Sequence, residues 1–164
     1  MEAVTLRSGT AAETRRLGAQ LGRRLQAGDV LLLQGKLGSG KTVLAQGIGQ
    51  GLKVQEDVKS SSYVLLNEYH GRLTLYHADL YRLVEPSEVA DLALEETAAP
   101  GVLVVEWPER AWEELPAEHL LVRLEEEPPQ PDSRQRGRQL ALLPAGRRYE
   151  ELARDFMLQW QRRD

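Results

Sequence analysis

The sequence has no cysteine among its 164 residues, and this absence excludes several kinds of chemistry. Without cysteine the chain has no disulfide framework, no thiolate zinc site and no cysteine nucleophile. It also has no apolar run that approaches the roughly 18 residues of a membrane-spanning helix, and residues 1–30 lack a basic-then-apolar signal pattern. A net charge of −4 gives no overall attraction to nucleic acid or to an anionic membrane. We therefore expect a cytoplasmic protein that has neither a membrane nor DNA as its partner.

Hydrophobic patterns divide the chain into alternating strands and helices. We expect strands over residues 4–6, 30–33, 102–105, 120–124 and 139–143, and an antiparallel hairpin formed by 63–69 and 73–79. We expect helices over residues 11–27, 42–52, 87–94 and 147–163. A proline- and charge-rich stretch over 127–138 is expected to form a mobile loop. This order predicts one α/β domain over residues 1–164, in three layers with a mainly parallel central sheet.

Three glycines fall inside the helix expected over 42–52. Gly47, Gly49 and Gly51 each cost about 1 kcal/mol relative to alanine in a helix interior. We infer that this helix packs closely against a neighbouring element, because a close approach of two backbones favours glycine.

Residues 35–42 read G-K-L-G-S-G-K-T, between an expected buried strand and an expected helix. In this spacing the glycines let the backbone curl so that successive N–H groups point at phosphates, and the helix N-terminus adds its free amides. Lys41 adds a positive charge near the β- and γ-phosphates, where we expect it to act in catalysis, and the Thr42 hydroxyl is a magnesium ligand. The segment predicts a P-loop that binds a nucleoside triphosphate with Mg²⁺. The nucleotide-binding residues expected here are Gly35, Lys36, Leu37, Gly38, Ser39, Gly40, Lys41, Thr42 and Val43.

Glu106 follows the apolar run Val102–Val105 and is expected at the carboxyl end of a buried strand. Ligands of open α/β sheets bind at that edge. Mg²⁺ prefers oxygen ligands. We therefore expect Glu106 to join Thr42 as a metal ligand, either directly or through a water molecule.

The segment H-A-D-L-Y-R over residues 77–82 ends the second strand of the expected hairpin. A hydrolytic P-loop protein needs a group that orients water near the γ-phosphate. Asp79 is the candidate, either as a base or as a metal-linked group that orients water. The alternative is a structural Asp–Arg pair that caps a turn. His77 has no metal-ligand partner at a suitable spacing, so we predict no histidine metal site.

Two further residues each allow two interpretations. Trp107 is either a core or rim aromatic or a stacking platform for the nucleobase. Ser62 lies between the P-loop helix and the hairpin, where a switch loop that reaches the metal or the γ-phosphate would lie. The run of three serines over 60–62 is also typical of an ordinary solvated loop, and the sequence alone favours that interpretation.

Four segments occur in order within one small domain: G-K-L-G-S-G-K-T, V-K-S-S-S-Y, H-A-D-L-Y-R-L and V-E-W-P-E. In these segments the chain resembles the bacterial TsaE (YjeE) family of ATPases, over residues from about 17 to about 143. Members of that family act in making N6-threonylcarbamoyladenosine at position 37 of tRNAs that read A-starting codons. The resemblance implies ATP and Mg²⁺ as cofactors. It implies the TsaD and TsaB proteins as partners, with tRNA involved only through their complex.

The resemblance also implies roles for single residues. Thr42 and Glu106 would be the magnesium ligands, and Asp79 would be important for hydrolysis. Trp107 would stack on the adenine. Arg138 would be an arginine that reaches the nucleotide, although the sequence alone favours a solvated basic loop there.

Three positions depart from the family pattern. Lys36 replaces the usual acidic residue inside the P-loop, and Val43 replaces a second threonine. The pair Ser61-Ser62 replaces Pro-Thr in the switch segment, where Ser62 would take the place of the switch threonine. Serine keeps the hydroxyl, whereas loss of the proline makes the segment less rigid.

Three functions stay open on these residues. The first is an ATPase, slow without its partners, that serves the tRNA-modification complex. The second is a small-molecule kinase that uses residues 127–138 as an arginine-rich lid, and the third is a non-hydrolytic module that binds a partner when nucleotide is present. A GTPase is disfavoured, because there is no Asn-Lys-x-Asp segment and the one asparagine is Asn67. Direct RNA binding has little support, because the domain is acidic overall and shows no RNA-binding motif.

Overall fold

The computed structural model describes residues 3–59, 65–129, 131–132 and 136–162. Its centre is a seven-stranded sheet with the order β1-β7-β6-β2-β5-β4-β3. The strands are β1 (Val4–Ser8), β2 (Val30–Gln34), β3 (Leu66–Tyr69), β4 (Leu75–Asp79), β5 (Val102–Glu106), β6 (His119–Glu126) and β7 (Arg138–Ala145). Each strand expected from the sequence is present, although residues 63 and 64 of the hairpin lie outside the described ranges.

The four central strands of the sheet run parallel. β2 pairs in parallel with β5 and with β6, and β5 pairs in parallel with β4. β3 joins β4 as the antiparallel hairpin expected from the sequence. On the other side, β7 pairs antiparallel with both β6 and β1, an arrangement that the strand patterns alone did not predict. The parallel centre and the hairpin are thus confirmed, and the carboxyl ends of β6, β2, β5 and β4 meet at one edge.

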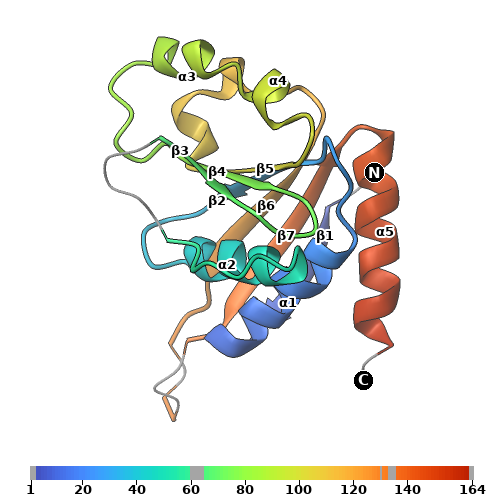
Figure 1. Cartoon of the computed structure of the whole chain (residues 1–164). Coiled ribbons are helices and arrows are strands. Elements are labelled where there is room, and N and C mark those ends of the chain that lie inside the picture. Colours follow the sequence, from blue (N-terminus) through green and yellow to red (C-terminus); the bar gives the residue numbers. More distant parts are fainter. Residues whose placement is uncertain (1–2, 60–64, 130, 133–135, 163–164) are drawn as a thin grey trace.

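Helices cover both faces of this sheet (Figure 1). α1 (Ala11–Arg23), α2 (Lys41–Gly51) and α5 (Arg147–Gln161) pack on one face, and α3 (Ser87–Leu92) and α4 (Leu94–Ala98) pack on the other. In β2, Leu31 and Leu33 point to the first face, and Val30 and Leu32 point to the second. A strand buried on both faces needs an unbroken apolar run. No helix within the described ranges is long and apolar enough to cross a membrane.

Two helices differ from the expected ranges. The helix expected over 11–27 ends at Arg23, and the following residues form a turn in which the Gln26 amide donates to Asp29 Oδ2. The helix expected over 87–94 is instead two short helices, because Ala93 takes a left-handed backbone conformation with φ of 45°. A single residue in that conformation cannot continue a right-handed helix.

Glycines allow α1 and α2 to approach very closely. A Cβ atom on Gly47 would lie 2.2 Å from the Arg15 carbonyl oxygen, and one on Gly51 would lie 2.2 Å from the Ala19 carbonyl oxygen. Gly18 of α1 faces α2 in the same way, with the Leu44 carbonyl oxygen 2.5 Å away. This confirms the close packing inferred from the glycines of α2. The contact fixes α2, and with it the P-loop that leads into its N-terminus.

Candidate nucleotide-binding site

The sheet brings the P-loop and the ends of two neighbouring strands to one edge. Because β2, β4 and β5 are parallel, their carboxyl ends lie together, and residues 35–40 lead from β2 into α2. A cavity of about 320 Å³ opens at this edge. Its walls are Thr10, Ala11, Thr14, Leu37, Gly38, Ser39, Gly40, Lys41, Thr42, Val43, Asp79, Tyr81, Glu106, Trp107, Arg136 and Arg138.

The loop has a backbone that only glycine adopts without strain at two positions. Gly38 has φ of 79° and Gly40 has φ of 103°, both in the left-handed region. Gly40 is also the N-cap of α2, and within the described residues this helix has no side-chain cap. The first amides of a helix lack partners within the helix and attract anions. The loop and the start of α2 therefore present donors to a phosphate group.

Lys41 lies folded against the loop. Its ammonium donates to the carbonyl oxygens of Gly35 and Lys36, the latter at 2.9 Å. It also lies 4.1 Å from the centroid of the Trp107 ring, within the range of a cation–π contact. Gly35 and Lys36 thus contribute carbonyl groups that hold Lys41, and neither residue lines the cavity.

Burial and nearby carboxylates have opposite effects on the pKa of Lys41. Burial lowers the pKa of its ammonium below the usual value, and the nearby carboxylates of Glu106, Glu109 and Asp79 partly oppose that shift. Desolvation disfavours the charged form, and nearby opposite charges favour it. A bound polyphosphate would add negative charge in the cavity and favour the charged lysine further.

Thr42 and Glu106 are in direct contact. The Thr42 hydroxyl donates to Glu106 Oε1 at 3.3 Å, from the first turn of α2 to the end of β5. Glu106 pairs in register with Leu33 of β2 and with Asp79 of β4. The start of α2 therefore supplies a hydroxyl oxygen beside the P-loop, and the ends of β4 and β5 supply two carboxylates. Oxygen atoms of this kind are the ligands that Mg²⁺ prefers.

His77 makes the second contact of Glu106, a contact that the sequence patterns did not predict. His77 Nε2 lies 2.6 Å from Glu106 Oε2, and the two side chains are only 1% and 2% exposed. Strand alternation does indicate that His77 shares a face with Asp79, two residues later. Glu106 lies beside His77 and Asp79 because β4 pairs in parallel with β5. The residue patterns do not specify that pairing.

Asp79 ends β4 at the rim of the cavity. Its Oδ1 accepts a hydrogen bond from the Tyr81 amide at 3.0 Å, so the carboxylate also stabilises the turn that follows the strand. An aspartate that bonds the backbone two residues later is typical of turns. Asp79 therefore combines a turn contact with a place in the cavity wall.

Trp107 lies beside the P-loop. Its backbone is left-handed, with φ of 59°, and its ring packs 4.9 Å from the Tyr81 ring at 45°. With the Lys41 contact, this places the indole beside the lysine of the P-loop. Stacking of Trp107 on adenine stays a prediction. Tyr81, the aromatic partner, was not among the site residues expected from the sequence.

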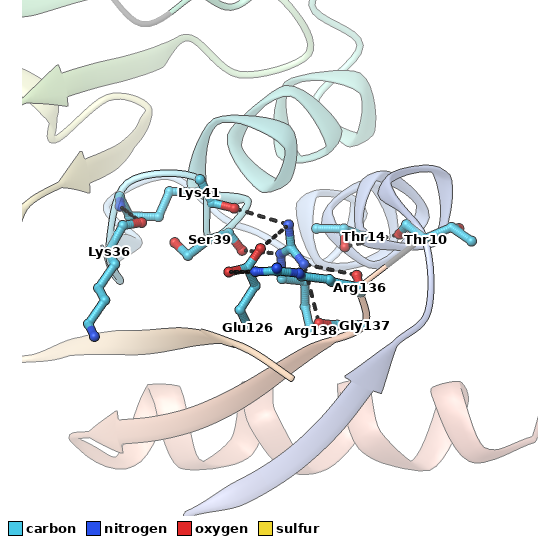
Figure 2. Close-up of polar contacts among 10 residues, drawn as sticks. Thr10, Thr14, Lys36, Ser39, Lys41, Glu126, Arg136, Gly137 and Arg138 are labelled. Atoms are coloured by element: carbon cyan, nitrogen blue, oxygen red, sulfur yellow. Dashed lines mark hydrogen bonds and ion pairs between the residues drawn. The ribbon is translucent and has the colours of Figure 1, made fainter. Parts of the chain in front are cut away.

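Arg138 begins β7 and reaches the backbone of the P-loop (Figure 2). Its Nε donates to the Ser39 carbonyl and its Nη2 donates to the Gly38 carbonyl, each at 3.0 Å. Its guanidinium also pairs with Glu126 at 3.4 Å. Arg138 therefore holds the loop and lines the cavity, and a direct contact with the nucleotide stays a prediction.

The described residues that depart from the family pattern lie in different parts of the site. Figure 2 shows the Lys36 side chain directed away from Arg138, so its positive charge points away from Arg136 and Arg138. Leu37 is 69% exposed at the tip of the loop, and Val43 lines the cavity. Ser62, the expected switch residue, lies outside the described residues.

Comparisons with known proteins agree with this geometry. A family model described as "Threonylcarbamoyl adenosine biosynthesis protein TsaE" matches residues 8–136. A protein from Treponema pallidum, named tRNA threonylcarbamoyladenosine biosynthesis protein TsaE, is 46% identical over 110 residues, which are 66% of this chain and 82% of that protein. A protein of the same name from Nostoc sp. is 50% identical over 103 residues, which are 59% of this chain and 63% of that protein.

The fold comparison gives the same result. The crystal structure of YdiB from Bacillus subtilis superposes with a TM-score of 0.79 and 28% sequence identity, and the match covers 96% of each chain. The family model spans most of the chain, including the P-loop and the ends of β4 and β5. We conclude that this chain belongs to the TsaE family of threonylcarbamoyl adenosine biosynthesis proteins.

Proposed function

We propose that this protein is an Mg²⁺-dependent ATPase that supports the TsaB–TsaD complex in forming N6-threonylcarbamoyladenosine at position 37 of tRNAs that read A-starting codons. One observation carries the proposal. Lys41, Thr42, Asp79 and Glu106 converge on one cavity at the start of α2. A cation, two carboxylates and a hydroxyl beside free helix amides are the groups that bind and hydrolyse a nucleoside triphosphate.

In this proposal the loop binds the phosphates. The amides after Gly38 and at the start of α2 would donate to phosphate oxygens. Lys41 would leave the carbonyls of Gly35 and Lys36 and turn to the β- and γ-phosphates. The loop would then exchange an internal contact for a contact with the ligand.

The metal would be held by Thr42 and Glu106. Their side-chain oxygens already lie 3.3 Å apart, so both fit a small cation that takes oxygen ligands. Bound Mg²⁺ would neutralise negative charge on the β- and γ-phosphates. Glu106 would orient its carboxylate toward that position, and Thr42 would hold its hydroxyl there.

Asp79 would act on the attacking water. It lies in the cavity wall and pairs in register with Glu106 across β4 and β5, which supports a role beside the proposed metal position. A carboxylate there can accept a hydrogen bond from water and align it with the γ-phosphate. We assign Asp79 this orienting role, either as the base or as a positioning group.

The role in tRNA modification rests on the family. The printed names of the relatives refer to tRNA threonylcarbamoyladenosine biosynthesis. We propose that ATP hydrolysis by this chain resets the TsaB–TsaD complex for further turnover in the cytoplasm, with tRNA engaged through that complex. ATP is favoured over GTP because the sequence has no Asn-Lys-x-Asp segment.

The test is phosphate release from ATP by the purified chain, alone and with TsaB–TsaD, beside a panel of small-molecule acceptors. We expect slow release by the chain alone, faster release with the complex, and no labelled acceptor. Transfer of the γ-phosphate to an acceptor without partners would establish a kinase instead. Full tRNA modification supported by an Asp79→Ala variant that hydrolyses no ATP would establish a nucleotide-gated binding module.

A further inference from the structure

The two carboxylate oxygens of Glu106 have different partners. Oε1 accepts from the hydroxyl of Thr42, which lines the cavity, at 3.3 Å. Oε2 lies 2.6 Å from His77 Nε2 in the interior of the protein. Oε1 therefore contacts the other residue proposed to hold the cation, whereas Oε2 contacts His77.

The hydrogen-bonding pattern defines which atom donates. A carboxylate that binds a metal ion is deprotonated and only accepts hydrogen bonds, so beside such a ligand His77 Nε2 carries the hydrogen and donates it to Glu106 Oε2. Within the described part of the chain, His77 Nδ1 is buried and has no hydrogen-bond partner. The ring thus directs its Nε2–H donor at Glu106. Hydrogen bonds to a charged acceptor are stronger than those between neutral groups.

The surroundings of His77 keep the ring in place. It lies in β4, which pairs with β5 along its whole length, and its side chain is 1% exposed. Leu75 and Val104, which share this face of the sheet, are fully buried in the core beneath α1 and α2. A rigid donor in a packed strand restricts rotation of the Glu106 carboxylate.

We propose that His77 is a positioning residue that holds one oxygen of Glu106 and leaves the other for the divalent cation, so that the site prefers Mg²⁺ over Ca²⁺. The inference rests on the proposed function, because it takes Thr42 and Glu106 as the metal ligands. Mg²⁺ needs a compact octahedral shell, whereas the larger Ca²⁺ readily takes both oxygens of one carboxylate. Freeing Oε2 would let Glu106 offer both oxygens and would reduce the discrimination against Ca²⁺.

The test measures binding of a fluorescent, non-hydrolysable ATP analogue to the full chain, with MgCl₂ or CaCl₂ titrated separately. His77→Phe removes the donor and keeps a ring, and His77→Gln keeps a donor at the position of Nε2. His70→Gln changes an exposed histidine in the turn between β3 and β4 and serves as the control. Loss of a partner that orients a metal ligand typically weakens the metal site by about 10- to 100-fold, and we expect that loss for Mg²⁺ in His77→Phe.

The expected pattern is specific to a positioning role. His77→Phe should lose affinity for Mg²⁺ more than for Ca²⁺, while His77→Gln and the control keep the preference of the unmodified protein. Equal losses for both cations, or an unchanged preference in His77→Phe, would overturn the inference and leave the proposed function standing. If Mg²⁺ does not tighten nucleotide binding by the unmodified protein, the proposed function and the inference both fail.

A measurement on the unmodified protein covers the case in which His77→Phe does not fold. In ¹⁵N-histidine NMR, the Nε2–H signal of His77 can be assigned by its absence from His77→Gln. We expect this signal to persist, still hydrogen-bonded, when the analogue and Mg²⁺ saturate the site. Its loss on Mg²⁺ addition would show that Glu106 turns away from His77 to bind the metal, which contradicts the inference.

Discussion

The ammonium of Lys41 lies 4.1 Å from the centroid of the Trp107 ring. The same ammonium donates to two carbonyl groups of the P-loop. We expect a nucleotide that binds Lys41 to change the surroundings of Trp107, because the ammonium would turn toward the phosphates. This contact turns the tryptophan into a reporter of the phosphate site.

Nucleotide binding should change the fluorescence of Trp107. Departure of a cation from the face of the indole alters its electrostatic environment. The change should survive in a variant with Trp112→Phe and Trp160→Phe and should vanish in Trp107→Phe. A response that persists without Trp107 would place the signal at another tryptophan.

Replacement of Arg138 should weaken nucleotide binding with little effect on the fold. Its guanidinium donates to the Gly38 and Ser39 carbonyls, and removal of both bonds releases the loop that presents the amides. For Arg138→Ala we expect roughly tenfold weaker binding of an ATP analogue, equivalent to about 1.4 kcal/mol, by titration calorimetry. The control is Arg147→Ala on α5, whose side chain is 92% exposed. Equal affinities of Arg138→Ala and the control would show that the loop needs no such support.

A methyl group between α1 and α2 should destabilise the protein. In Gly47→Ala the new Cβ would meet the Arg15 carbonyl oxygen at 2.2 Å, and both atoms belong to packed helices. We expect the free energy of unfolding to fall by about 1–3 kcal/mol in a denaturant titration. In the control Gly9→Ala, a Cβ would meet only flexible side-chain atoms at 3.4 Å. Equal stability of the two variants would contradict the close packing.

The buried phenol of Tyr149 should make stability fall at alkaline pH. Its hydroxyl oxygen accepts from the Val30 amide at 2.9 Å, and burial raises the pKa of the phenol above its ordinary value of 10.0. Above pH 10.0 the phenol loses its proton in the unfolded chain before it does so in the folded protein. The stability that the buried phenol contributes is therefore complete below pH 10.0, and it is lost as the pH rises through the pKa of the phenol in the folded protein. In Tyr149→Phe this part of the decline should disappear from unfolding free energies measured between pH 8 and 11, a range of about one to two units on either side of the ordinary value. An identical pH dependence in the variant would refute the assignment.

Much of the fold followed from the sequence because its signals are local. The apolar run over 30–33, the glycine loop and the glycines of α2 each reflect a constraint within a few residues of the chain. The break at Ala93 was missed because alanine favours helix, so its residue type gives no sign of the left-handed conformation that it adopts.

The site was predictable in its loop and less so in its contacts. Glu106 could be chosen because it ends an apolar strand, and Asp79 because it lies in the polar segment that ends the second strand of the hairpin. The contact of His77 with Glu106 depends on which strands are neighbours, and Arg138 meets Ser39 across 99 positions of sequence. Contacts of this kind depend on the topology of the sheet, which residue patterns alone do not determine.

The most direct test of the account is single-turnover phosphate release from ATP with Mg²⁺ by Asp79→Ala, beside the affinity of the same variant for a non-hydrolysable analogue. If Asp79 orients water in a P-loop ATPase, release should slow by about 100-fold or more. The affinity should stay close to that of the unmodified protein. Phosphate release at the unmodified rate would contradict the role of Asp79 in orienting water, because hydrolysis would then not need the carboxylate at the end of β4.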